Sequence, residues 1–359
     1  MSAPMTIYDF IERNNRNTLL LVLMFPVTLC LLVFILTFIA LMLLDVDGGL
    51  SYGGIVLADA SDFGIFGDFF KVNENTAYLV VIFKAALGLT LIGTLPIFLF
   101  SFIWMMIAYF HGSDMILSAS MANPVKRSDS PEIYALVENV AIAAGLPTPK
   151  LYIIQDESMN AFATGRDVNH ASITLTTGLI KNLDRLELKA VIGHEMAHIG
   201  NRDIRLMLMI IIGIGISAFL ADLLFRVLSS SRPRSSGNNN NNAGALYLIV
   251  VIMAIALALF SFCIAPLLRF AISRSQEYRA DATSAIITRN PGALARALEK
   301  ISKDSRVEAL DNMPSVGALC IANPLGNNAK KLFDSLSGLY ATHPPIAKRI
   351  QALRTMDSM

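Results

Sequence analysis

The sequence predicts a mainly α-helical membrane protein that also carries an α+β domain with a small β-sheet. Three observations support this fold class. Apolar residues make up 54% of the 359 residues, charged residues only 16%, and the mean hydropathy is +0.55, whereas soluble domains carry about 25% charged residues. Four apolar runs are long enough to cross a bilayer, which takes about 20 residues. The two polar blocks outside these runs show both strand and helix patterns.

The four apolar runs divide the chain into membrane and polar regions. The first run is too long for the core of a signal peptide and lacks a convincing cleavage site, so we expect it to be retained. The runs lie at about residues 18–44, 79–109, 204–228 and 244–268. We therefore predict an N-terminal membrane pair (1–110), a first part of the polar domain (111–203), a membrane hairpin (204–268) and a second part of that domain (269–359).

The distribution of charge sets the expected orientation. The loop at about residues 45–76 is strongly acidic, whereas basic residues such as Arg13 and Lys126 lie at the other ends of the first two runs. The positive-inside rule therefore places the N-terminus and the polar domain in the cytoplasm. Arg232 and Arg234, between the last two runs, weaken this picture. Either the first pair of runs dominates the topology, or the last two form a shallow hairpin, and both alternatives return the chain to the same side.

Composition excludes two classes of function. The formal net charge is +1 and the sequence has no strongly basic patch, so we expect no nucleic-acid partner. The three cysteines are Cys30, Cys263 and Cys320, and the first two lie inside apolar runs. Neither a disulfide framework nor a cysteine metal site is therefore predicted.

The polar blocks predict helices around a few strands. Ser130 as N-cap, Pro131 in the first turn and Gly145 at the end predict one helix, and a second helix is expected to start near Asp184. Alternation of apolar and polar residues predicts the strands. The first block is expected to hold these elements at about 131–145, 150–156, 160–165, 171–177 and 184–201, and the second block helices at about 274–288, 292–303 and 344–356.

His194, Glu195 and His198 form an H-E-x-x-H motif in the helix that starts near Asp184. Residues four apart share one face of a helix, so both imidazoles can reach one ion. Zinc suits two histidines and a carboxylate, with an open position for water. Bound zinc brings the pKa of that water close to neutral, and Glu195 is placed to accept its proton. The motif therefore indicates metal-assisted hydrolysis.

Two alternatives compete with this interpretation. A surface helix can carry two histidines by chance, because the motif is short. A di-iron bundle would need Glu-x-x-His pairs on several helices, and the chain holds a single such pair, so we set this alternative aside.

A third protein ligand is required. The candidates are His111, His170, His343 and acidic residues further along the chain. Among the acidic residues, Glu277 can bind the ion, while Asp281, one helical turn later, accepts a hydrogen bond from the far nitrogen of a ligand histidine. By spacing alone, an ordinary solvated helix face fits these two residues equally well.

The neighbouring apolar runs favour Glu277. One run begins at Ile204, after His198, and another ends at Leu268, before Glu277. At 1.5 Å per residue, continuous helices would place the two ligands roughly 9 Å and roughly 13 Å from the hydrocarbon. The hairpin returns the chain to the same side of the membrane, so the segments that carry His198 and Glu277 are expected at a similar distance from the hydrocarbon.

Together these pieces resemble the HtpX-type membrane zinc metalloproteases, whose wider peptidase family also contains the type I CAAX prenyl proteases. The matching stretches occur in the family's order, with a hydrophobic hairpin between the second and third ligands. They cover most of the chain from about Pro131 onward. The stretches are NAFATG (160–165), TLTTGLI (174–180), HEMAHIGNRD (194–203), EYRAD (277–281) and THPPIAKRI (342–350).

The resemblance implies a gluzincin-type protease domain. His194, His198 and Glu277 would bind one Zn²⁺ per chain, with Asp281 behind a ligand histidine and Glu195 as the general base and acid.

The resemblance also implies residues that handle the substrate. His343 would lie near the reacting carbonyl and stabilise the oxyanion or the departing group, although the residue alone fits a helix N-terminus with no catalytic duty. Arg349 would buttress that region. An edge strand would pair with the substrate backbone through Asn160, Ala161, Phe162 and Ala163.

The implied function is an integral membrane endopeptidase that cleaves damaged or surplus membrane proteins on the cytoplasmic side of a bacterial inner membrane. The expected partners are unfolded or membrane-protein substrates and the lipid bilayer, and the oligomeric state stays open. Three alternatives remain. A protease whose zinc helix lies within the bilayer is disfavoured by the charges that flank the motif. A prenyl-protein protease is disfavoured because four membrane runs are few, and a scaffold with an inactive metal site because no catalytic residue is missing.

Overall fold

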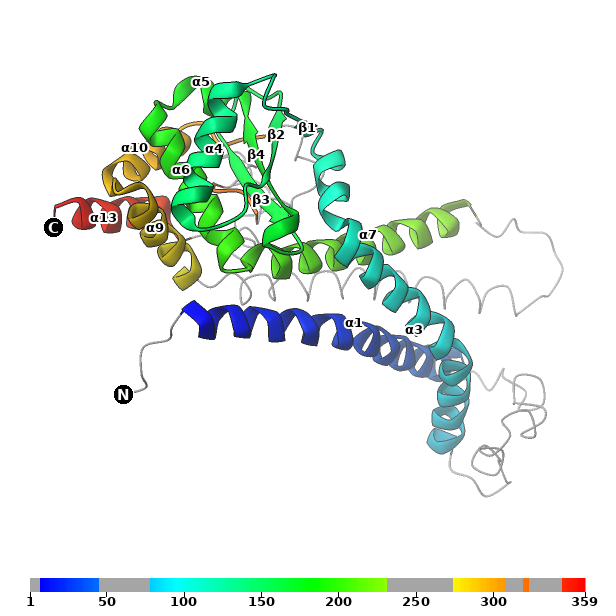
Figure 1. Ribbon diagram of the computed structural model, residues 1–359. Coiled ribbons are helices and arrows are strands. Elements are labelled where there is room, and N and C mark those ends of the chain that lie inside the picture. Colours follow the sequence, from blue (N-terminus) through cyan, green and yellow to red (C-terminus); the bar gives the residue numbers. More distant parts are fainter. Residues whose placement is uncertain (1–6, 45–77, 231–273, 308–318, 323–343, 359) are drawn as a thin grey trace, which may run out of the picture. The chain divides into compact units, whose positions relative to one another are not determined.

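The computed structural model describes residues 7–44, 78–230, 274–307, 319–322 and 344–358 (Figure 1). The chain forms two compact units. The first consists of Met1–Leu21, Met105–Ile214 and Cys263–Met359, and the second of Val22–Trp104 and Gly215–Phe262. Three long helices contribute to both units: α1 (Ile7–Leu44), α3 (Tyr78–Ala119) and α7 (Asp203–Ser230).

Two helices among the described residues are long and apolar enough to cross a membrane, Ile11–Leu32 in α1 and Phe98–Ala119 in α3. They overlap the first two predicted runs. The other two predicted spans are not confirmed, and the run at 244–268 lies outside the described residues. The start of the third run is helical as predicted, but Leu208 and Met209 are fully buried within the first unit. This part of α7 is therefore protein core.

The helix α3 continues beyond the predicted end of its apolar run, near residue 109, to Ala119. The reason is packing in the first unit, because Ile116 and Leu117 are buried there. Gly112 lacks the Cβ atom that would clash with Ile212 of α7, so the two helices approach closely. The juxtamembrane stretch is thus the last part of one long helix.

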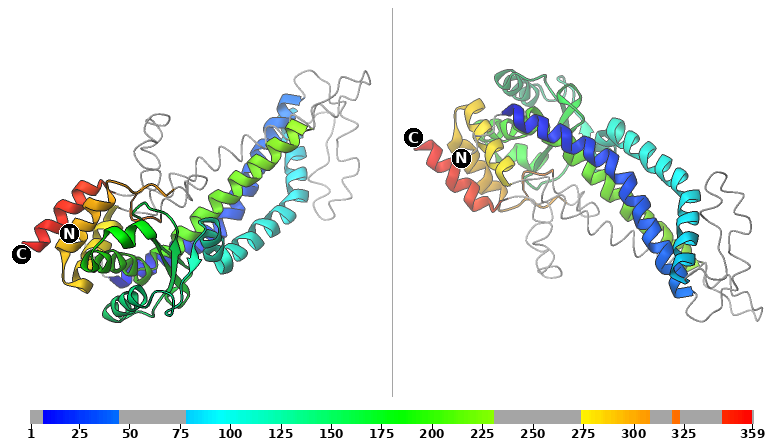
Figure 2. Two further views of the ribbon diagram at one scale, coloured as in Figure 1. Left: turned by 90° about the horizontal axis from the view of Figure 1, so that it is seen from above. Right: turned by 90° about the horizontal axis from the view of Figure 1, so that it is seen from below.

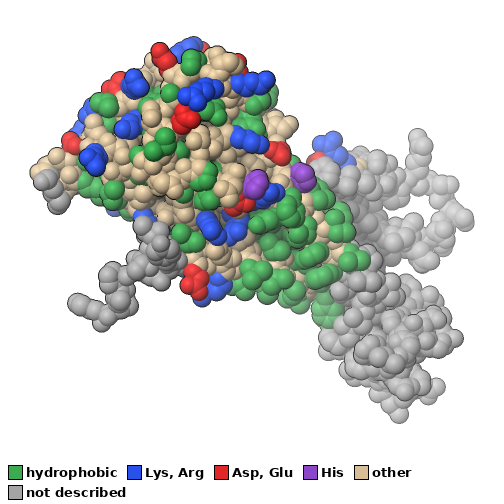
Figure 3. Space-filling model, in the orientation of Figure 1, with side chains coloured by type: hydrophobic (Ala, Val, Ile, Leu, Met, Phe, Trp, Pro, Cys, Tyr) green, Lys and Arg blue, Asp and Glu red, His purple; other side chains and the backbone are tan. Residues whose placement is uncertain are grey.

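Apolar side chains lie exposed along α1 and α3. Figure 3 shows a face on which hydrophobic side chains gather. An exposed apolar area of this kind suits contact with lipid. The exposed residues include Leu19, Leu20, Leu23, Met24, Val27, Phe98, Leu99, Phe100 and Ile103.

The sheet of the first unit has four strands, β1 (Asn123–Pro124), β2 (Lys150–Ile154), β3 (Ala161–Gly165) and β4 (Ala171–Thr176), in the order β1-β2-β4-β3. β2 and β4 are parallel, whereas β3 pairs antiparallel with β4. The predicted strands at 150–156, 160–165 and 171–177 are confirmed, and β1 was not predicted. Because β3 ends the order, one of its edges is left for other segments.

Most of the predicted capping signals of this unit are confirmed, but the Ser130 side chain makes no cap hydrogen bond at the start of α4 (Pro131–Ala144). This helix ends at Gly145, whose φ of 66° is left-handed. α6 (Arg185–Gly200) begins with a capping box in which Asp184 and Glu187 bond each other's backbone N–H groups, an arrangement that satisfies otherwise unpaired donors. The remaining helices are α5 (Thr177–Asn182), α9 (Arg274–Thr288), α10 (Pro291–Ile301) and α13 (Ile346–Asp357).

The helix α6 lies at the centre of the unit. It packs against β3 and β4 on one side and against α4, α9 and α10 on the others (Figure 2). At Gly193 an added Cβ atom would lie 2.9 Å from Ser284 Oγ of α9. Ser284 Oγ also donates a hydrogen bond of 2.6 Å to the Ala190 carbonyl. The glycine therefore lets α9 pass close to α6, which brings together the residues that these two helices carry.

Candidate metal centre

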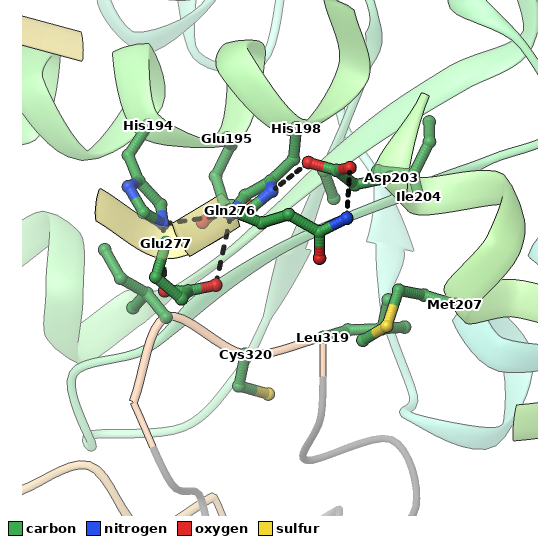
Figure 4. Close-up of a pocket in the computed structure, with 12 residues that line it drawn as sticks. His194, Glu195, His198, Asp203, Ile204, Met207, Gln276, Glu277, Leu319 and Cys320 are labelled. Atoms are coloured by element: carbon green, nitrogen blue, oxygen red, sulfur yellow. Dashed lines mark hydrogen bonds and ion pairs between the residues drawn. The ribbon is translucent and has the colours of Figure 1, made fainter. Parts of the chain in front are cut away.

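The helix α6 presents His194, Glu195 and His198 to one pocket, and α9 adds Glu277 from the facing side (Figure 4). The Nε2 atoms of the two histidines are 3.1 Å apart. Glu277 Oε2 is 3.8 Å from His194 Nε2, and Glu277 Oε1 is 3.5 Å from His198 Nε2. The three predicted ligands thus converge, with donor atoms within 4.8 Å of one another.

These distances fit a tetrahedral zinc ion. Zn–N bonds of about 2.0–2.1 Å separate two nitrogen ligands by about 3.3–3.4 Å, close to the observed separation of the Nε2 atoms. Within the described part of the chain, no other group of histidine, cysteine and acidic side chains converges in this way. Of the alternative third ligands, His111 and His170 are exposed and do not belong to this group. His343 lies outside the described residues.

Each ligand histidine is held from behind by a carboxylate. His194 Nδ1 lies 3.0 Å from Asp281 Oδ1, the arrangement expected from the sequence. His198 Nδ1 lies 3.1 Å from Asp203 Oδ2, which the sequence analysis missed. A hydrogen bond at Nδ1 fixes the ring so that the Nε2 lone pair faces the ion.

Arg349 of α13 supports the site from deep inside the unit, with no exposed surface. It donates two hydrogen bonds to the Asp281 carboxylate, of 2.7 and 2.9 Å, and its Nη1 lies 3.1 Å from Glu277 Oε2. Burial raises the pKa of Asp281, but the Arg349 charge and the hydrogen bond from His194 outweigh burial and lower it below its ordinary value. Arg349, which we predicted to support this region, therefore forms ion pairs with two carboxylates, those of Asp281 and Glu277.

Burial and charge shift the pKa values of the central residues in different directions. Burial lowers the pKa of His194 and raises that of Glu195 to about 7. Burial also lowers the pKa of His198, but the hydrogen bond to Asp203 and the charge of Glu277 outweigh it and raise the pKa to about 9. The carboxylates around His198 thus favour a positive charge there, which a bound cation can supply.

Residues 127–357 match the family model described as peptidase family M48. The chain belongs to peptidase family M48. This membership confirms the resemblance found in the sequence, and it implies a metal in the site, in this family usually zinc.

Relatives of this M48 peptidase support the same assignment. A protease HtpX homolog of Bacteroides fragilis (strain YCH46) is 42% identical over 252 residues, which cover 70% of this chain and 76% of that protein. A protease HtpX homolog of Lactobacillus helveticus (strain DPC 4571) is 34% identical over 298 residues, or 79% and 97% of the two chains. The crystal structure of S. mikatae Ste24p is similar with a TM-score of 0.41 and 18% identity over 72% and 57% of the chains. The family match and the HtpX homologs, together with the two candidate membrane spans, support a membrane metalloprotease.

The predicted substrate strand of this M48 peptidase lies beside the metal centre, as the edge strand β3. Its residues are buried because the segment 319–322 runs along the free edge. The Ile321 N–H donates to the Ala161 carbonyl at 2.9 Å, and Cys320 forms an antiparallel bridge with Phe162. Asn160 Nδ2 donates to the Ala322 carbonyl at 3.1 Å. Part of the edge is thus already paired within the chain.

The pocket has a polar side and an apolar side. The metal-ligand residues and Glu195 form the polar side, and the Ala163 N–H bonds to the Glu195 carboxylate. The apolar side is formed by Ile204, Met207 and Leu319 (Figure 4). An apolar side chain of a bound molecule would be accommodated there.

Four residues near the centre were not predicted as part of it. Asp203 ends the matching stretch 194–203 and Gln276 directly precedes the stretch 277–281, but neither spacing indicates contact with a ligand. Asn14 and Cys320 lie far from the motifs and reach the site only through packing. A polar asparagine at the start of an apolar run was the one signal available for Asn14, since such residues tend to find buried partners.

Proposed function

We propose that this M48 peptidase is a zinc-dependent endopeptidase whose active site is built on His194, His198 and Glu277. The observation that carries the proposal is the convergence of these three side chains beside the buried carboxylate of Glu195. Hydrolytic zinc sites use such a set of two imidazoles and one carboxylate as protein ligands and leave a fourth coordination position open for water.

The residues of the site have distinct duties in this proposal. Bound zinc supplies a Lewis acid that lowers the pKa of a water molecule to near neutrality. Glu195 Oε1 is buried and has no hydrogen-bond partner among the described residues, so it is available to accept a proton from the attacking water. Once it is protonated, Glu195 can donate that proton to the departing amine. Asp281 and Asp203 keep both Nε2 atoms directed at the ion.

We propose that a substrate binds in extended conformation along β3, through Asn160, Ala161, Phe162 and Ala163. The Ala161 carbonyl accepts a hydrogen bond from Ile321, so a substrate that uses this carbonyl replaces the segment 319–322.

The substrates proposed are unfolded chains and damaged or surplus membrane proteins. The apolar side of the pocket supports this class, since it suits an apolar residue next to the scissile bond. We place the site on the cytoplasmic side of a multi-pass protein in a bacterial inner membrane. The reason is the positive-inside rule: the acidic stretch 45–76 joins the first two apolar runs, whereas the basic residues Arg13 and Lys126 lie beyond their other ends in the sequence. His343 lies outside the described residues, and its duty at the oxyanion stays a prediction.

The test compares the purified full chain in detergent micelles with its Glu195→Gln variant, using a fluorescently labelled unfolded protein as substrate. The wild-type chain should cleave it only when loaded with zinc. Glu195→Gln should retain one zinc per chain and lose activity by about 10²- to 10⁴-fold, the usual contribution of a general base.

A matched control is Glu157→Gln, since Glu157 is an exposed glutamate that pairs with Lys181 outside the pocket. It should cleave at the wild-type rate. Cleavage by Glu195→Gln as fast as by wild type, or full activity of the zinc-free chain, would rule out the proposed mechanism.

A further inference from the structure

Three buried polar side chains meet behind the second ligand histidine. They come from three separate segments: Asn14 from α1, Asp203 from the start of α7 and Gln276 from α9. Their exposed fractions are 2%, 5% and 4%. Burial of a carboxylate is costly unless hydrogen bonds compensate it, so the surroundings of Asp203 determine how it is held.

The two oxygens of Asp203 face different partners. Oδ2 lies 3.1 Å from His198 Nδ1. Oδ1 accepts hydrogen bonds from Asn14 Nδ2 at 2.7 Å and from Gln276 Nε2 at 3.2 Å. Figure 4 shows Asp203 between His198 and Gln276. The amides therefore fix the plane of the carboxylate whose other oxygen orients the imidazole.

Asn14 also holds the turn that carries Asp203. Its Nδ2 donates a second hydrogen bond, of 3.0 Å, to the Asn201 carbonyl. Between these two partners lies Arg202, a non-glycine residue with a left-handed φ of 58°, a conformation that surrounding contacts must stabilise. One side chain of α1 thus bonds both ends of the turn between α6 and α7.

We propose that Asn14 is a positioning residue of the metal centre. Through Asp203 it fixes the orientation of His198, so that the docking of the first helix determines how tightly the protein binds its metal. The inference rests on the proposed zinc site. Asn14 belongs to the segment Ile11–Leu32, one of the two candidate membrane spans, and the membrane anchor is then part of the metal site.

In the alternative interpretation, the two amides only provide hydrogen bonds to the buried Asp203 carboxylate and do not affect metal binding. The test measures the zinc dissociation constant of the full chain in detergent micelles by competition with a chromogenic chelator. Asn14→Ala should weaken zinc binding by about 10- to 100-fold, the usual effect of losing a partner behind a ligand. The visible spectrum of bound Co²⁺ should change as well, because it reports ligand geometry, which a purely structural role would leave intact.

The matched control is Asn15→Ala, on the same turn of α1. Asn15 Oδ1 accepts hydrogen bonds from Arg202 and Arg205, so this variant perturbs the same turn without removing an amide donor to Asp203. It should change zinc affinity by no more than about twofold, because both amide donors to the Asp203 carboxylate stay in place. In the Asp203→Ala background, Asn14→Ala should have no further effect, since the group through which it acts is gone.

Three results would overturn the inference: wild-type affinity and Co²⁺ spectrum in Asn14→Ala, equal weakening by Asn15→Ala, or additive effects of Asn14→Ala and Asp203→Ala. If Asn14→Ala does not fold, Gln276→Met removes the other amide donor at similar volume. Weaker zinc binding with a changed spectrum then supports the inference, and unchanged binding overturns it. A wild-type chain without zinc affinity would instead refute the proposed function.

Discussion

The two ligand histidines are supported by different kinds of neighbour. Behind His194, Asp281 forms a buried ion pair with Arg349 of the C-terminal helix. Behind His198, Asp203 accepts hydrogen bonds from two neutral amides, one of them on the N-terminal helix. Asp281 thus belongs to a charged network with Arg349, and Asp203 belongs to an amide network with Asn14 and Gln276. A buried ion pair makes each partner indispensable to the fold, whereas neutral donors orient a carboxylate without leaving a large uncompensated charge when they are lost.

The largest effect is expected from removing the cation of the charged network. Arg349→Met leaves Asp281 and Glu277 buried without their counter-charge, and breaking such a pair costs about 3–5 kcal/mol of unfolding free energy. Chemical denaturation of the zinc-free protein measures it. Arg354→Ala, on the same helix with an exposed partner in Glu299, should cost at most about 1 kcal/mol. If both variants lose a similar amount of unfolding free energy, the buried ion pairs of Arg349 contribute no more to stability than an exposed pair.

Removal of zinc should have the next largest effect. Zinc at about 100 times its dissociation constant stabilises the folded state by about 2.7 kcal/mol. Stripping the wild-type chain with a chelator should therefore lower its melting temperature, and adding zinc back should restore it. The same zinc concentration should stabilise Asp203→Asn less, because its affinity is lower. An identical shift in both proteins would contradict the importance of the amide network for zinc binding.

The two supporting carboxylates can be compared directly. Asp281→Asn and Asp203→Asn should each weaken zinc binding by about 10- to 100-fold. Asp281→Asn should also destabilise the zinc-free fold, and more than Asp203→Asn, since the fully buried Arg349 loses one of its carboxylate partners. Chelator competition measures the affinities, and denaturation of the zinc-free proteins measures the stabilities. Equal losses of stability would remove the distinction between the two networks.

The smallest effect on stability is expected from a substitution that changes the distance between α6 and α9 and leaves every charge in place. Gly193→Ala places a Cβ atom 2.9 Å from Ser284 Oγ and forces α9 away from α6, at a typical cost of about 1–3 kcal/mol. Adding Ser284→Ala should restore part of the stability, because it removes the clashing oxygen. Gly200→Ala is the control, since its Cβ would meet only the flexible end of Leu146. If the denaturation curves show no recovery of stability when Ser284→Ala is added to Gly193→Ala, the clash with Ser284 is not the cause of the loss.

Local patterns explain which features could be predicted. The H-E-x-x-H spacing sets two imidazoles on one helix face, and Asp184, Gly145 and the alternation in 150–177 mark where elements begin and end. These signals act over a few residues, so they are readable without the fold. The one-turn spacing of Glu277 and Asp281 is also a local signal, but alone it fits a solvated helix face equally well, and the neighbouring apolar runs were needed to favour Glu277 as a ligand.

The ligand types, the helices that carry them, three of the four described strands and the membrane character of the chain could therefore be predicted from the sequence. The contacts of Arg349 with Glu277 and Asp281, of Asp203 with His198, and of Asn14 with Asp203 became known from the folded structure. The physical reason is that such contacts join residues distant in sequence. Their pairing depends on how helices pack and where turns adopt unusual dihedral angles, and neither property follows from local periodicity.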